Sequence, residues 1–157
     1  MIDAKRRILL KGSLAAGAVG VAVGAGLLAP RAVLAAWPQA AFEATDIKAG
    51  LKALIGVEAG ETGGDITIKA PDIAENGAVV PVTVESTATG VKSITIIAEG
   101  NQTPLIASFN LGEDATPSVS TRIKMAKTSN VQAVVQTADK VYTAAKEVKV
   151  TIGGCGG

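Results

Sequence analysis

The stretch VPVTVES at residues 80–86 places a valine at every second position. A period of two puts alternate side chains on opposite faces of a β-strand, so the stretch predicts a strand with one apolar face. Runs with the same period stand at 66–68, 94–96, 105–111, 119–125, 131–135 and 148–152, with Val141 before the last of them. Turn-forming pairs such as Asn76-Gly77 and Thr89-Gly90 separate the runs. The sequence therefore predicts seven or eight short antiparallel strands in an all-β sandwich.

The spacing of these strands is typical of an immunoglobulin-like sandwich, although the cysteine pair and core tryptophan of antibody domains are missing. One strand carries Pro81, which has no amide hydrogen to donate to a sheet, so we expect it at an edge or in a bulge. A short helix is predicted before the sandwich, capped by Thr45 and ended by Gly56. Its apolar residues fall at helical spacing: Ile47, Leu51, Leu54 and Ile55.

The composition excludes several kinds of chemistry. The chain has no His and one Cys, which excludes a Ser/His/Asp triad, haem attached at C-x-x-C-H, and zinc or iron-sulfur sites built from several thiols. We therefore expect no catalytic residue, no metal and no cofactor. The first 35 residues hold five of the 15 basic residues and one of the 14 acidic ones, so the remainder has 10 basic against 13 acidic residues. With no basic stripe for a phosphate backbone, nucleic acid binding is not expected.

The first 35 residues have the organisation of a signal peptide. The charged segment KRRILLK at 5–11 precedes an uncharged run from 12 to 29 that ends at Pro30. This segment resembles the twin-arginine export signal, with Arg6 and Arg7 as its arginine pair. Cleavage is expected after Ala35 or one residue later. Five glycines weaken the apolar run as a membrane anchor, so no stable membrane insertion is expected.

The twin-arginine route places the protein in the bacterial periplasm and moves chains that have already folded. Such cargo commonly holds a cofactor or a partner, and this chain carries no cofactor motif. A partner bound before export is the explanation we favour, and rapid folding alone is the other. Residues 36–152 are then the sandwich domain, with residues 153–157 as a separate tail.

The tail GGCGG at residues 153–157 contains the only thiol of the chain, Cys155. Glycines have no side chains with which to bury a thiol and leave the backbone free to rotate, so Gly153, Gly154, Gly156 and Gly157 predict a flexible arm. From Ile152, Cys155 can swing by roughly 10 Å. A free thiol in an oxidising compartment is a liability unless it is used, so we expect a function at Cys155.

Two other interpretations of the tail stay open at this point. A structural or adhesion domain could use Cys155 for an interchain disulfide, the usual suspicion for a single cysteine in an exported protein. A ubiquitin-like protein could instead be activated at the carboxylate of Gly157, although that chemistry needs ATP. The mass of the native protein separates these interpretations, because the first gives a dimer and the second a modified C-terminal carboxylate.

Behind a twin-arginine signal and an all-β domain, this tail resembles that of the SoxY family, the sulfur carriers of the bacterial Sox thiosulfate-oxidation system. Three internal segments are also similar to the family: AENGAVVPV at 74–82, TRIKM at 121–125 and VKVTI at 148–152. The resemblance covers essentially the whole chain after the signal peptide.

The resemblance implies a role for each residue of the tail. Cys155 would be the covalent attachment point for sulfur intermediates, and the four glycines its hinge. It implies no turnover by the carrier itself. A c-type haem enzyme would join thiosulfate to the thiol, a hydrolase would release sulfate, and a sulfane dehydrogenase would oxidise the remaining sulfur. It further implies a heterodimer with SoxZ, another small β protein.

Overall fold

The computed structural model describes residues 37–151, which begin with two short helices, α2 (Gln39–Phe42) and α3 (Ile47–Ile55). Asp46, and not Thr45 as predicted, caps α3: its carboxylate accepts a hydrogen bond from the Ala49 amide at 2.9 Å. The side chain of an N-cap residue accepts from a backbone amide in the first turn of the helix. That amide belongs to Ala49, three residues after Asp46, so Asp46 is the cap and its neighbour Thr45 is not. Gly56 ends the helix as predicted, with a φ of 79° that favours glycine.

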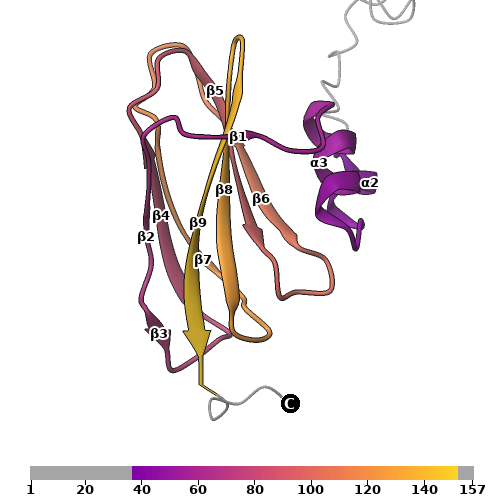
Figure 1. Cartoon of the computed structure of the whole chain (residues 1–157), viewed down its shortest axis with the longest axis vertical. Helices are drawn as coiled ribbons and strands as arrows, with labels where there is room; N and C mark the ends of the chain where they lie inside the picture. The colour runs from indigo at the N-terminus through magenta and orange to yellow at the C-terminus, as the bar shows by residue number, and fades with distance from the viewer. Residues whose placement is uncertain (1–36, 152–157) are drawn as a thin grey trace, which may run out of the picture. The chain divides into compact units, whose positions relative to one another are not determined.

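Two sheets pack face to face and confirm the all-β sandwich (Figure 1). The smaller sheet has the order β2-β4-β7 and is antiparallel throughout, with β2 (Ile66–Lys69), β4 (Val80–Ser86) and β7 (Ser118–Ile123). The larger sheet has the order β1-β9-β8-β5-β6. Its strands are β1 (Glu61–Thr62), β5 (Val91–Ala98), β6 (Leu105–Asn110), β8 (Ser129–Thr137) and β9 (Val141–Val150), and β3 (Ile73–Ala74) also pairs with β9.

The two shortest strands depart from the predicted antiparallel pattern. Both β1 and β3 run parallel to β9, along different halves of the same edge. Two residues are too few to show a period, so the sequence carries no strand signal there. The pairing that holds the end of β9 could therefore not be predicted.

Pro81 lies on β4, the central strand of the smaller sheet, so the expectation of an edge strand or a bulge was wrong. The register explains how a central strand tolerates proline. Pairing with β2 begins only at Thr83, opposite Lys69, while Pro81 has a strand partner only in β7, at Arg122. The side of the backbone that β2 would occupy is free at Pro81, and no ladder bond is lost there.

The core between the sheets is built from alternate residues of the long strands. Val80, Val82 and Val84 of β4 are buried against residues of the larger sheet that include Ile94, Ile96, Val131, Ala133, Val135 and Val148. Such a contiguous cluster supplies the main apolar stabilisation of a domain of this size.

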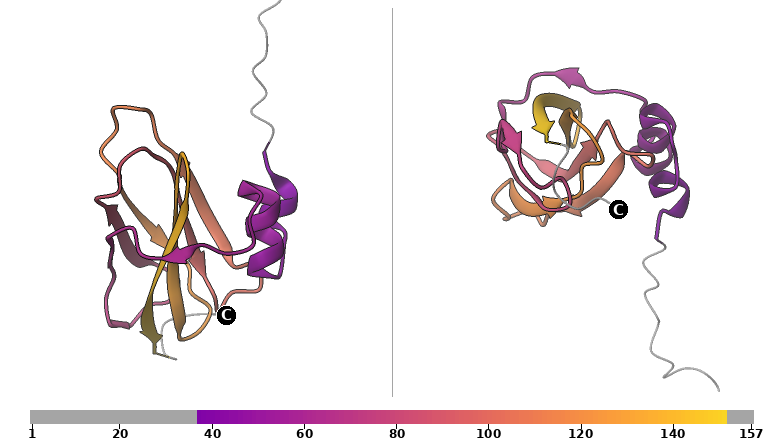
Figure 2. Two further views of the ribbon diagram at one scale, coloured as in Figure 1. Left: turned by 45° about the horizontal axis from the view of Figure 1, so that its top comes forward. Right: turned by 90° about the horizontal axis from the view of Figure 1, so that it is seen from below.

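A second apolar cluster covers the outer face of the larger sheet. Leu51 of α3 and Ala41 of α2 pack on Ile97, Leu105 and Val134, which are buried on that face. A Cβ at Gly50 would lie 2.9 Å from a methyl group of Leu105 and 3.1 Å from the Ala41 carbonyl oxygen, so the absence of a side chain helps α3 to pack closely here. Figure 2 shows both helices on one side of the sandwich, away from the smaller sheet.

Candidate functional site at the end of strand β9

The predicted site residues Cys155, Gly153, Gly154, Gly156 and Gly157 lie outside the described residues, as do Arg6 and Arg7. The structure instead describes the place from which the tail leaves the fold. Strand β9 ends at Val150, followed by Thr151, at the end of the sandwich where β3 also lies (Figure 1).

Strand β3 holds one edge of β9 to its last residue. The Lys149 amide donates to the Asp72 carbonyl at 3.0 Å, and the Thr151 amide donates to the Ala74 carbonyl at 3.1 Å. The Thr151 hydroxyl adds a longer hydrogen bond, 3.4 Å, to the Glu75 carbonyl. Backbone pairing therefore reaches as far as Thr151.

The other edge of β9 is held in a different way. Its ladder with β8 ends at the pair Ser129 and Val148, two residues before β9 itself ends. Beyond that pair, the Val150 amide donates to the Thr128 hydroxyl oxygen at 2.9 Å. The same hydroxyl lies 3.4 Å from the Val150 carbonyl, to which it donates. A side chain thus continues the pairing after the strand partner has ended.

The loop that carries Thr128 is itself fixed. The side chain of Asn101 bridges it, donating to the Lys124 carbonyl and accepting from the Ala126 amide, both at 2.8 Å. The Met125 amide donates to the Gly77 carbonyl at 2.7 Å, and Met125 is buried in the core. The loop therefore presents Thr128 from a defined position.

Gly77 brings the turn after β3 against the end of β9. A Cβ at this position would lie 2.5 Å from the Met125 carbonyl oxygen and 2.8 Å from Cγ1 of Val150. Only glycine allows this approach, since real Cβ atoms do not come so close to backbone. Lys146 of β9 also binds the segment before β3. Its ammonium forms an ion pair with an Asp72 carboxylate oxygen at 3.0 Å and donates to the Ala70 carbonyl at 2.6 Å.

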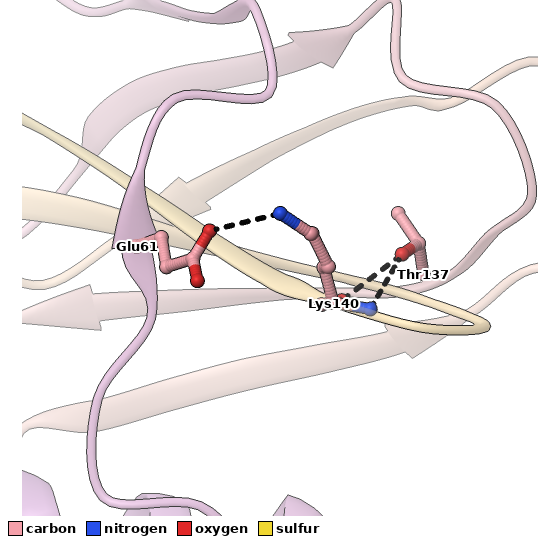
Figure 3. A network of polar contacts seen from close by, with 3 residues as sticks. All are labelled: Glu61, Thr137 and Lys140. Carbon is pink, nitrogen blue, oxygen red and sulfur yellow. Dashed lines mark hydrogen bonds and ion pairs between the residues drawn. The ribbon is translucent and has the colours of Figure 1, made fainter.

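The opposite end of the sandwich carries a separate polar network around the β8–β9 hairpin (Figure 3). Lys140 forms an ion pair with Glu61 at 3.3 Å, and its amide donates to the Thr137 hydroxyl at 3.0 Å. An open depression of about 350 Å³ lies beside these residues. Val150 lies nine positions after Val141 along β9, about 30 Å away at an ordinary strand rise.

Within residues 37–151 there is neither a cluster of metal-ligating side chains nor a membrane-spanning helix. Over this range, no group of three or more His, Cys, Asp or Glu side chains is placed to hold a metal ion. None of the described helices is long and apolar enough to cross a membrane.

Sequence reasoning predicted that the tail follows the last strand, but it missed the residues that hold the end of that strand. The sequence did contain a signal for two of these residues, because the segment 74–82, which resembles the family, includes both Ala74 and Gly77. Nothing in the sequence pointed to Thr128, because a threonine in a polar loop is ordinarily expected to be exposed to solvent.

The comparisons with known proteins agree with this architecture. The family described as sulfur oxidation protein SoxY matches residues 51–155. The solved structure of the sulfur carrier protein SoxY from Chlorobium limicola f thiosulfatophilum has 43% sequence identity and a TM-score of 0.60, covering 68% of this chain and 97% of that one. No curated protein sequence matches the chain significantly.

A superoxide reductase (neelaredoxin) from Ignicoccus hospitalis is also similar in structure. It has 19% identity and a TM-score of 0.50, over 59% of this chain and 82% of that one, so this likeness concerns the fold alone. The family match extends over most of the chain and ends on the single cysteine. The chain therefore belongs to the SoxY family of sulfur-oxidation carrier proteins.

Proposed function

We propose that the protein carries sulfur intermediates covalently on Cys155 and presents them to partner enzymes during thiosulfate oxidation. The observation that carries this proposal is the position of the only thiol: the family match runs from residue 51 to Cys155 itself. The protein is then a carrier rather than an enzyme, because chemistry at the thiol is performed by other proteins.

The proposed cycle begins with an oxidative coupling. The Cys155 sulfur and the outer sulfur of thiosulfate form a sulfur–sulfur bond, the thiol loses its proton, and two electrons pass to a c-type haem enzyme. Water then attacks the terminal sulfonate in a hydrolase, which releases sulfate and two protons and leaves a persulfide anion on Cys155. A sulfane dehydrogenase then takes six electrons from the outer sulfur of the persulfide, while three waters supply its oxygens and six protons are released, which leaves an S-sulfonate on Cys155. Hydrolysis by one more water releases a second sulfate and a proton and returns the free thiol.

The end of β9 suits such a carrier. Hydrogen bonds on both edges hold the backbone up to Thr151, so the segment that bears Cys155 begins at a defined point. Cys155 lies four positions after Thr151, which allows a reach of about 13–14 Å when the chain is extended. We propose that Gly153, Gly154, Gly156 and Gly157 keep this arm flexible enough to enter narrow active sites.

We further propose that the carrier works in the periplasm as a heterodimer with a SoxZ-like β protein. Residues 1–35 would be removed after export, and Arg6 and Arg7 would direct the folded chain to the twin-arginine route. Binding a partner before export would explain the use of this route by a chain without a cofactor motif.

Mass spectrometry of the natively purified protein, together with a Cys155→Ser variant, tests the proposal. We expect mass additions on Cys155 that match thiosulfonate or persulfide and disappear on reduction. The Ser variant should lose thiosulfate-dependent oxidation while keeping its unfolding midpoint, because the residue follows the last strand. Ser118→Cys restores a thiol elsewhere in the Ser variant, as a matched control, and should not restore activity.

Two outcomes would contradict the carrier function. Normal thiosulfate oxidation by the Ser variant would remove the carrier role from Cys155. A native mass equal to two copies of the chain joined through Cys155, with no sulfur adduct, would support the structural domain with an interchain disulfide instead.

A further inference from the structure

The end of β9 extends beyond the strand that pairs with it. The ladder between β8 and β9 stops at Ser129 and Val148, although β9 continues to Val150. On this edge, an ordinary sheet end would leave the Val150 amide and carbonyl to water, and strand ends of that kind fray.

Thr128 replaces the missing partner. Its hydroxyl accepts a hydrogen bond from the Val150 amide at 2.9 Å and donates one to the Val150 carbonyl at 3.4 Å. One side chain therefore provides hydrogen-bond partners for both backbone groups of Val150. A hydroxyl can do this because it carries one donor and two acceptor lone pairs. On the opposite edge, Val150 is flanked by the Lys149 and Thr151 amides, which donate to the Asp72 and Ala74 carbonyls.

We propose that Thr128 is a positioning residue, which sets the point at which the Cys155-bearing segment leaves the fold. The inference rests on the carrier function proposed above. It assigns to the body of the domain a part in sulfur transfer that does not involve contact with the sulfur.

Loss of the hydroxyl would lengthen the free segment. The bonds of Lys149 and Thr151 to the β3 edge remain, so losing the hydroxyl raises the fraction of time for which β9 opens back to Val148. In that open state, the number of residues from the last held residue to Cys155 grows from four to seven. The extended reach then rises from about 13–14 Å to about 23–25 Å. The effective concentration of a tethered group falls roughly as the −3/2 power of tether length, which gives about a twofold loss at a partner active site.

Thr128→Val is the test variant, because it keeps the branched shape and removes the hydroxyl. Thr128→Ser keeps the hydroxyl and should behave like the wild type. Thr89→Val is the matched control, since Thr89 is an exposed threonine in the β4–β5 turn at the other end of the sandwich.

Hydrogen exchange and a nitroxide attached to Cys155 measure the effect on the purified protein. In Thr128→Val we expect the Val150 amide to exchange about two- to tenfold faster, the effect of one lost hydrogen bond. The nitroxide spectrum should show greater mobility, while the Ile96 and Val134 amides of the core stay protected. Thr128→Ser and Thr89→Val should match the wild type in both measurements.

Coupling of thiosulfate by the c-type haem enzyme should fall in Thr128→Val by at most about twofold, the value for a fully open β9 end, with an unchanged rate toward a small aromatic disulfide. Unchanged Val150 exchange, unchanged nitroxide mobility, or the same defect in Thr128→Ser would overturn the role of Thr128. These results are separate from the carrier function, which fails if Cys155→Ser remains active or if the native protein is a dimer joined through Cys155 with no sulfur adduct.

Discussion

The carboxylate of Asp46 accepts from the Ala49 amide at 2.9 Å and completes the first turn of α3. That helix buries Leu51 on the larger sheet, so the cap supports packing as well as local structure. We expect Asp46→Ala to lower the free energy of unfolding by about 1 kcal/mol, the usual effect of losing a cap. Urea denaturation measures this change, and Thr45→Ala is the control. An equal loss in both variants would show that Asp46 has no special role.

Gly77 is the second residue whose substitution should change stability. Its missing Cβ leaves room for the Met125 carbonyl and for Val150 at the end of β9. Gly77→Ala should lower the free energy of unfolding by about 1–3 kcal/mol, because the backbone must shift to admit a methyl group. Gly112 has open space around it and no positive φ, so Gly112→Ala should change the urea midpoint little. A Gly77→Ala protein as stable as Gly112→Ala would contradict the close approach.

At the scale of elements, the long strands were predictable because they alternate. Val80, Val82 and Val84 faced the core as their spacing predicted, and Gly56 ended α3. The short parallel strand β3 was not predictable, since Ile73 and Ala74 show no period. Pro81 was misjudged because sequence does not reveal where β2 stops beside β4. The hydrogen bond between Thr128 and Val150 joins a loop residue to the last residue of β9, 22 positions later in the sequence, and only the fold brings them together.

The glycine arm is the element with the most direct functional prediction. Replacing Gly153 and Gly154 by proline would hold two φ angles near −65° and restrict the swing of Cys155. We expect this variant to react normally with small thiol reagents and to lose most transfer from partner enzymes. Alanine at both positions is the milder control, because it leaves more of the backbone freedom. Equal enzymatic turnover in the proline variant and the wild type would exclude a hinge at these glycines.

For the whole molecule, we expect a heterodimer with a small β protein. Two observations support this expectation. The N-terminal segment resembles a signal peptide that exports folded proteins although the chain has no cofactor motif, and the chain belongs to the SoxY family. Sedimentation of natively purified material should show a two-chain species that persists under reducing conditions, unlike a dimer joined through Cys155. A lone monomer at micromolar concentration would count against the heterodimer, and a species that separates on reduction would favour the interchain disulfide.

Export by the twin-arginine route is also expected of the whole chain. The segment KRRILLK at 5–11 resembles a signal read by a translocase that accepts folded proteins, and residues 1–36 lie outside the described structure. Changing Arg6 and Arg7 to Lys conserves charge but removes the guanidinium groups, so a translocase that reads the arginine pair should reject the chain. We expect full-length precursor to accumulate in the cytoplasm, measured by fractionation and intact mass. Lys11→Arg should be exported normally and cleaved beside Ala35, whereas normal export of the double lysine variant would reject the twin-arginine route.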